Sequence, residues 1–352
     1  MRTLCSVAAL QTLAHDLLTA AGLAPALADI VARQLGEAEL LGRDTHGFVL
    51  LDWYLADLQS GAMRGDGEVC TVADHGAAVV WDARRLPGAV VLERAIDVAL
   101  ARLRQHPVVT IAIRESHHLG CHAVYVRRAA VANALALLMD TNPGYHVVAP
   151  FGSTEPVYSP TPLGIGIPHA GEPIVIDFSL SSCSSNRVKL SRQRRERLPG
   201  KWLIDASGIP TDDPEVLFAD PPGSILPLGG ADLGYKGFAL ALMAYALSAG
   251  LAGHDVDDDA RGSYSAVFLQ LIDPERFSGR SAFGAIVSDF VHSCRAAGER
   301  TTKNVHIPGE QHASNRAAAL RTGVAVDDDC LGMLARWARV LSVAIPELAP
   351  DG

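Results

Sequence analysis

The sequence predicts an α/β fold in which a mixed β-sheet occupies the middle of the chain and helices from both ends form a second domain. Apolar residues recur at helical spacing before residue 70 and after residue 280, whereas short β-like runs alternate with helical stretches between them. A chain of 352 residues is long enough for two domains. We therefore expect a helical domain of residues 1–70 and about 285–352, and an α/β domain of about residues 71–284.

Composition and charge exclude several classes of protein. The 49% hydrophobic content with 20% charged residues is that of a globular chain and not of a disordered one. Thirty basic against 39 acidic residues give a net charge of −9, which argues against attraction to nucleic acid or to an anionic membrane. The six cysteines include no C-x-x-C pair, which favours reduced thiols in the cytoplasm. The sequence predicts a soluble cytoplasmic protein.

Three helices are expected in the first sixty residues. Leu10, Leu13 and Leu17 recur at helical spacing before Gly22. A second helix opens at Pro25 and continues to residue 41, and a third covers about residues 48–58.

The middle of the chain alternates between strands and helices. Strands are expected at 77–81, 108–113, 134–139, 164–167, 173–178 and 266–272, with helices at about 89–104 and 121–132. The basic run 187–201 is interpreted as a solvated loop, and the apolar run 238–253 as a buried helix too short to span a membrane. An acidic turn at 257–259 follows, and the last helices are expected near 281–298, 311–322 and 327–343.

A standard dinucleotide-binding fingerprint is absent. The nearest match, Gly164-Ile165-Gly166-Ile167-Pro168, lacks the third glycine and is followed by proline instead of a helix start. The sequence therefore does not predict a Rossmann fold.

Two histidine segments are candidates for proton transfer. His46 is flanked by Thr45 and Gly47, and His118 follows a predicted strand within Ser116-His117-His118-Leu119-Gly120. Imidazole exchanges protons near neutral pH, and strand ends often carry catalytic side chains. Ordinary structural histidines explain both segments as well. His118 and His122 are spaced i, i+4, but no metal is expected because the segment offers no carboxylate ligand.

Three further segments offer groups for binding an anion or a ribose. The strand ending at Asp177 is followed by the hydroxyls of Ser179 and Ser181, which suit ribose and phosphate oxygens or, equally, a helix cap. Lys236 stands between glycine-rich sequence and an apolar helix, where it either serves an anion or is simply solvated. Arg187 in the basic run suits contact with an additional cofactor phosphate.

Taken together, these segments resemble the type 2 malate/L-lactate dehydrogenase family, which includes sulfolactate and ureidoglycolate dehydrogenases and piperideine- and pyrroline-2-carboxylate reductases. The resemblance runs through nearly the whole chain in order. It comprises 45–47, Ser116–Gly120, Thr141-Asn142, 149–152, Asp177–Ser181, Trp202–Pro214, Tyr235-Lys236-Gly237 and Pro308-Gly309-Glu310.

The resemblance implies a non-Rossmann NAD(P)-binding fold, a homodimer and a nicotinamide-dependent oxidoreductase that reduces C=O in a 2-oxo acid or C=N in a cyclic imine. The family's motif histidines correspond to His46 and His118, with substrate contacts expected at Thr45, Ser116 and Asn142. The expected cofactor contacts are Asp177, Phe178, Ser179, Leu180, Ser181, Arg187, Lys236, Gly237, Pro308, Gly309 and Glu310. NADPH is weakly favoured over NADH through Arg187.

One departure from the family pattern bears on the substrate. The family's S-H-G-x-x-R motif has an arginine where this chain has Leu50, and leucine cannot pair with a substrate carboxylate. We therefore expect poor activity on malate, lactate and pyruvate. The alternative to an enzyme is a diverged homologue that acts as a binding or scaffold protein.

Overall fold

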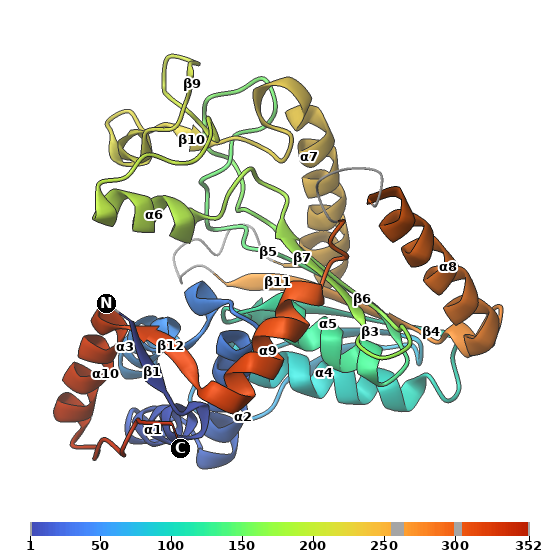
Figure 1. Ribbon diagram of the computed structural model, residues 1–352, viewed down its shortest axis with the longest axis horizontal. Coiled ribbons are helices and arrows are strands. Elements are labelled where there is room, and N and C mark those ends of the chain that lie inside the picture. The colour runs from blue at the N-terminus through green and yellow to red at the C-terminus, as the bar shows by residue number, and fades with distance from the viewer. Residues whose placement is uncertain (1, 255–263, 299–304, 351–352) are drawn as a thin grey trace.

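A seven-stranded mixed sheet forms the centre of the molecule (Figure 1). The computed structural model describes residues 2–254, 264–298 and 305–350. The strand order is β2 (Cys70–Asp74), β3 (Ala78–Asp82), β4 (Val108–Ser116), β11 (Ser265–Ile272), β5 (Leu135–Thr141), β6 (Pro162–Ile167) and β7 (Ile174–Ser179). Only β3 and β4 pair in parallel within this sheet; its other neighbours are antiparallel. The expected α/β class with a mixed sheet is confirmed.

Helices cover both faces of this sheet. The crossover helix α4 (Gly88–Arg102) contacts β4, and α5 (His122–Val131) contacts β5, β6 and β7. On the other side, α7 (Gly230–Tyr245) and the π-helical turn Ala246–Gly250 contact β5. A Cβ at Gly166 would lie 2.1 Å from the Val126 carbonyl oxygen of α5. The glycine in the partial G-x-G motif therefore permits close helix–sheet packing and does not form a phosphate loop.

The two ends of the chain pack together, as expected. β1 (Arg2–Cys5) pairs antiparallel with β12 (Val324–Asp327), and α10 (Asp328–Leu341) contacts both α1 (Val7–Ala20) and α3 (Leu51–Ser60). α9 (Glu310–Thr322) contacts α2 (Pro25–Leu40). α8 (Arg280–Gly298) lies at the right of Figure 1, on the side of the molecule opposite to α1 and α10. The predicted domain boundaries, between residues 70 and 71 and near residue 284, stay a prediction.

The remaining expected elements agree with the structure, with several differences. The strands β1, β2 and β12 were not expected from the sequence. The run 187–201 was predicted as a loop, but its first half belongs to α6 (Ser185–Arg194), whose start is capped by the Ser184 hydroxyl. Three short strands, β8 (Leu203–Ile204), β9 (Pro210–Thr211) and β10 (Ser224–Ile225), form a small separate sheet. The helix over 238–253 is not fully buried, because Leu242 is 57% and Leu251 52% exposed. The predicted acidic turn at 257–259 lies outside the described residues.

No helix within the described ranges is both long and apolar enough to cross a membrane. All six cysteines lie within the described residues and carry free thiols.

Candidate active site

His46 lies in a short 3₁₀ turn, Asp44–His46, directly after the end of α2. Gly47 follows because a side chain there would collide with a buried carboxylate: its Cβ would lie 2.0 Å from Oε1 of Glu39. That oxygen accepts a hydrogen bond from the Phe48 amide at 3.0 Å. Burial raises the pKa of Glu39 to about 7. The His46 turn is thus fixed to α2 by one buried carboxyl group.

His118 lies just beyond the end of β4 and faces His46. The two imidazole rings are stacked with centroids 6.2 Å apart and planes inclined by 22°. The Tyr54 hydroxyl of α3 lies 2.8 Å from His118 Nδ1, and the Trp53 ring packs 5.0 Å from the imidazole centroid. Residues from three separate segments therefore converge on one pair of histidines.

Both histidines are held toward the neutral form. Burial lowers the pKa of His118 well below 6.5, and the neighbouring imidazole of His46 lowers it further. Burial also lowers the pKa of His46, with Asp177 partly opposing and Arg43 reinforcing the effect. A neutral imidazole can accept a proton, so the pair can serve as a base near neutral pH.

The two neighbouring histidines have structural partners. His117 Nε2 lies 2.8 Å from Oδ2 of Asp57, which anchors the turn after β4 to α3. His122 Nε2 lies 2.8 Å from Oδ1 of Asp140, whose other oxygen accepts from the Ser265 hydroxyl. Burial opposes protonation of His122, but Asp140 outweighs it and raises the pKa. His122 begins α5 and His118 precedes that helix, so the i, i+4 spacing does not place them on one helix.

The three predicted substrate residues occupy different settings. The Thr45 hydroxyl lies 2.9 Å from His46 Nδ1 and so belongs to the histidine site. The buried Ser116 hydroxyl donates to the carbonyl of His117 at 2.9 Å, which shapes the turn. The backbone amide of Asn142 donates to Ser159 Oγ at 3.1 Å. Contact of these residues with a substrate stays a prediction.

The predicted cofactor residues on β7 and before α9 lie beside one another. The Val175 amide donates to the carbonyl of Pro308 at 3.2 Å, and a Cβ at Gly309 would lie 2.8 Å from the same amide nitrogen. Gly309 has φ +99°, a left-handed conformation that favours glycine. Glu310 accepts from the Ile307 amide and pairs with Arg295. Two segments that are 133 residues apart at the Val175–Pro308 contact therefore form one strip along the edge strand of the sheet.

The segment after β7 joins this strip to the start of α7. The Leu228 amide donates to the carbonyl of buried Leu180, and Gly237 donates to the carbonyl of Leu228. Lys236 is exposed beside it. The Ser181 hydroxyl is buried and donates to the Cys183 carbonyl at 2.7 Å, so it holds the turn. Phe178 is 39% exposed, and Arg187 is exposed on α6.

This strip offers groups of the kind that bind a nicotinamide dinucleotide. It offers glycines where backbone lies close together, exposed cations at Lys236 and Arg187, and an exposed ring at Phe178. The Asp177 carboxylate is already engaged, since Oδ2 accepts from the Ala123 amide at the start of α5. The residues that would hold such a cofactor are therefore the exposed ones, with the buried ones shaping the strip.

Arg43 links the His46 turn to the cofactor strip, a role that no sequence motif indicated: its carbonyl accepts from the His46 amide at 2.9 Å, and its side chain contacts the strip. Its Nη2 donates to the carbonyl of Asp177, and its Nε donates to Nε2 of His312, both at 3.1 Å. Burial and then the charge of Arg43 lower the pKa of His312. Leu50, by contrast, is only 6% exposed and belongs to the hydrophobic core.

The whole chain is similar in sequence to known proteins. The sequence profile of the family described as malate/L-lactate dehydrogenase matches residues 5–335. An L-lactate dehydrogenase from Cupriavidus necator is 31% identical over 97% of this chain and 99% of its own length. A (2R)-3-sulfolactate dehydrogenase (NADP(+)) from Chromohalobacter salexigens is 34% identical over 72% of this chain and 73% of its own.

Solved structures share the fold. The Δ1-piperideine-2-carboxylate reductase from Pseudomonas syringae superposes with a TM-score of 0.84 at 26% identity, covering 96% of this chain and all of that one. A malate/lactate dehydrogenase-like protein from E. coli gives a TM-score of 0.88 at 24% identity, covering 97% and 96% of the two chains. The family profile that matches residues 5–335 and the 31% identity to the Cupriavidus enzyme show that this chain belongs to the malate/L-lactate dehydrogenase family and is an oxidoreductase.

Proposed function

We propose that the protein is an NAD(P)H-dependent reductase of a carboxylate-bearing C=O or cyclic C=N compound, with His118 exchanging the proton. The observation that carries the proposal is the stacked pair His46 and His118 beside the strip of candidate cofactor residues, with Arg43 bonded to both Asp177 and His312. The cofactor supplies the hydride when bound.

The candidate proton-transfer group is His118 because its environment suits that task. Nε2 accepts a proton only when Nδ1 carries the ring hydrogen, and Nδ1–H then donates to the Tyr54 oxygen 2.8 Å away. Burial keeps Tyr54 protonated by raising its pKa, so the phenol remains a neutral partner for the ring. His46 is stacked on His118. It either orients the substrate or itself donates the proton.

Arg43 is the cation that we assign to the substrate carboxylate in place of the family's arginine at position 50. Both of its hydrogen-bond partners, His312 and the Asp177 carbonyl, are uncharged acceptors. A half-buried guanidinium that lacks an acidic partner among the described residues favours an anionic ligand. Since Arg43 reaches the site from a different backbone position, small acids such as malate, lactate and pyruvate are poorly aligned, and a longer or bulkier carboxylate is preferred.

The test is a substrate screen with two Arg43 variants. Rates of NADH and NADPH oxidation are measured with 2-oxo acids, cyclic imine carboxylates, and the amide of each acid. Arg43→Met should raise the KM for acids by roughly 10- to 100-fold, with little change for amides, and Arg43→Lys should recover part of the loss. Efficient turnover of malate or pyruvate by the wild type would contradict the assignment.

Leu50→Arg is a less direct test, because it would place a guanidinium within the hydrophobic core. Background rates with every substrate, despite normal cofactor binding, would support the scaffold alternative instead.

Three further properties belong to this proposal. NADPH is favoured over NADH, supported by the exposed Arg187 on α6 and by the NADP(+) in the name of the sulfolactate relative. Arg187→Ala should reduce that preference; an unchanged ratio of the two dissociation constants would remove the support.

A homodimer is supported by large apolar side chains exposed on α7 and α8, such as Leu242 and Phe290, and is tested by sedimentation. The six unpaired cysteines support a cytoplasmic location.

A further inference from the structure

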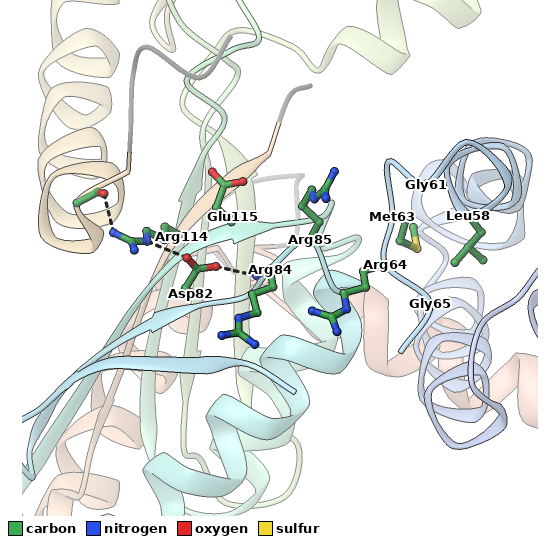
Figure 2. A pocket seen from close by; sticks show the side chains of 11 residues that line it. Leu58, Gly61, Met63, Arg64, Gly65, Asp82, Arg84, Arg85, Arg114 and Glu115 are labelled. Carbon is green, nitrogen blue, oxygen red and sulfur yellow. Dashed lines mark hydrogen bonds and ion pairs between the residues drawn. The ribbon is translucent and has the colours of Figure 1, made fainter. Parts of the chain in front are cut away.

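We propose that an arginine-rich hollow between α3 and the ends of β3 and β4 binds a small phosphate-bearing polyanion. The hollow has a volume of about 780 Å³, within the range of small-molecule sites. Its lining includes four arginines against two carboxylates, as Figure 2 shows: Arg64, Arg84, Arg85 and Arg114, with Asp82 and Glu115. None of these residues belongs to the histidine pair or to the cofactor strip.

The carboxylate at the centre of the hollow is already engaged. Asp82 Oδ2 accepts from Nε of Arg114 at 3.2 Å, and Oδ1 accepts from the backbone amide of Arg84 at 2.9 Å. Arg64 pairs at 3.4 Å with Asp66, which is 81% exposed and so only weakly neutralises it. Within the described ranges, no carboxylate pairs with the guanidinium groups of Arg84 and Arg85. The hollow therefore carries an excess of positive charge.

The backbone around the hollow is strained and held in place. Arg84, Arg85 and Glu115 have φ values of +52°, +64° and +54°, a left-handed conformation that is unfavourable for residues with side chains. The Arg85 amide donates to the carbonyl of Glu115 at 2.7 Å, and the Arg64 amide donates to that of Arg85 at 2.9 Å. These bonds join three segments of the chain and fix where their arginines emerge. Strain of this kind concentrates at binding sites.

The chemistry of the lining favours phosphate over other anions. The planar guanidinium group matches phosphate oxygens in a two-point contact, and several such groups suit a ligand with more than one negative charge. In Figure 2, Arg64 and Arg84 extend toward the same side of Asp82, while Leu58 and Met63 form a less polar wall beyond Arg64. The lining therefore suits an organic phosphate as well as an inorganic one.

The experiment is isothermal titration of the full chain with inorganic pyrophosphate at constant ionic strength, with orthophosphate and ADP as parallel arms. The test variant is Arg84→Gly/Arg85→Gly, because glycine accepts positive φ and leaves the turn unstrained. The matched control is Arg321→Ala/Arg339→Ala, which removes the same charge from exposed positions on α9 and α10. The test variant should weaken pyrophosphate binding by at least about tenfold, and the control should leave it unchanged. With the cofactor site saturated by NADPH, tighter binding of ADP than of pyrophosphate would identify an organic phosphate as the ligand, and the reverse an inorganic one.

Several outcomes would overturn the proposal. These are absence of binding to all three probes, equal loss in the control variant, and retention of affinity in the glycine variant. Loss of pyrophosphate binding when the protein is saturated with NADPH would show that both occupy one site. A change of oligomeric state in the glycine variant would identify the hollow as a contact between subunits. Because binding is measured without turnover, the result does not depend on the proposed reaction.

Discussion

The hydroxyl oxygen of Tyr54 lies 2.8 Å from Nδ1 of His118, and this bond links helix α3 to the end of strand β4. Tyr54 is 4% exposed and also packs against His117, whose ring is 5.4 Å away at an interplanar angle of 82°. The phenol therefore fixes the orientation of the imidazole from a buried position. Tyr54 is thus a positioning residue for His118.

Tyr54→Phe should lower kcat about tenfold while leaving the dissociation constant of the cofactor unchanged. The substitution keeps the packing but removes the partner of Nδ1, so the ring loses its preferred tautomer. The accompanying readout is the pH profile of kcat, which a purely structural loss would not move. An unaltered profile would leave Tyr54 with a packing role only.

His118→Ala should lower turnover by roughly 10²–10⁴, the usual effect of losing a general acid–base group. Cofactor affinity should change little, because His118 lies outside the candidate cofactor strip. The matched control is the exposed His75→Ala on the β2–β3 turn. Full activity of the His118 variant would exclude it from the mechanism.

The lowered pKa of His118 predicts opposite pH dependences for the two directions of the reaction. Oxidation needs the neutral imidazole as a base, so kcat/KM for oxidation should stay level down to pH values below 6.5. Reduction needs the protonated ring, so its rate should rise as the pH falls toward the same lowered pKa. Initial rates in both directions between pH 5 and 9 test this. An oxidation profile that already falls between pH 8 and 7 would contradict it.

Lys236→Ala should weaken cofactor binding by roughly 10- to 100-fold, because a charge-assisted hydrogen bond contributes about 1.5–3 kcal/mol. Lys236 is exposed beside the Leu180–Leu228 connection, where a phosphate can reach it. Fluorescence titration with NADPH measures the effect, and Lys201→Ala, also exposed, is the control. Equal dissociation constants for wild type and variant would place the cofactor elsewhere.

Glu39 should make the protein less stable as the pH rises. Burial raises its folded-state pKa from 4.5 to about 7, so the folded protein binds this proton more tightly than the unfolded chain does. Its contribution to stability is therefore fully present below pH 4.5 and is lost as the pH rises through 7, by up to about 3 kcal/mol. Glu39→Gln keeps an oxygen for the Phe48 amide and should remove this loss. Urea unfolding at pH 5 and pH 8 measures it, with the exposed-position variant Glu347→Gln as control.

Local patterns in the sequence were sufficient for most of the regular elements. The leucine spacing of α1, the Pro25 start of α2 and the apolar runs of β4 and β11 are local signals, and each element forms where they predict it. The helix α6 was missed because its charged residues suggested a loop, although Lys and Arg are good helix formers and Ser184 supplies a cap. The exposed side of α7 was missed because hydrophobicity alone does not say which face is covered.

Only the site residues that belong to the family motifs could be predicted from the sequence. Those motifs indicated His46 and His118, and the structure brings them together. The contacts of Arg43 with His312 and with the Asp177 carbonyl join residues 269 and 134 positions apart, so no local pattern could show them. The same holds for the burial of Leu50, which depends on packing between segments.

The position of β11 has a consequence for synthesis of the chain. β11 pairs with β4 along one edge and with β5 along the other, although it follows them by more than 120 residues. Until Ile272 has been made, the growing chain holds two half-sheets, β2–β3–β4 and β5–β6–β7. The edges of β4 and β5 that later pair with β11 are still unpaired. Such edges pair readily with other chains, and long-range pairing is slow. A chain that ends before Ser265 should therefore aggregate, and productive folding of the sheet has to wait until the last quarter of the protein is being translated.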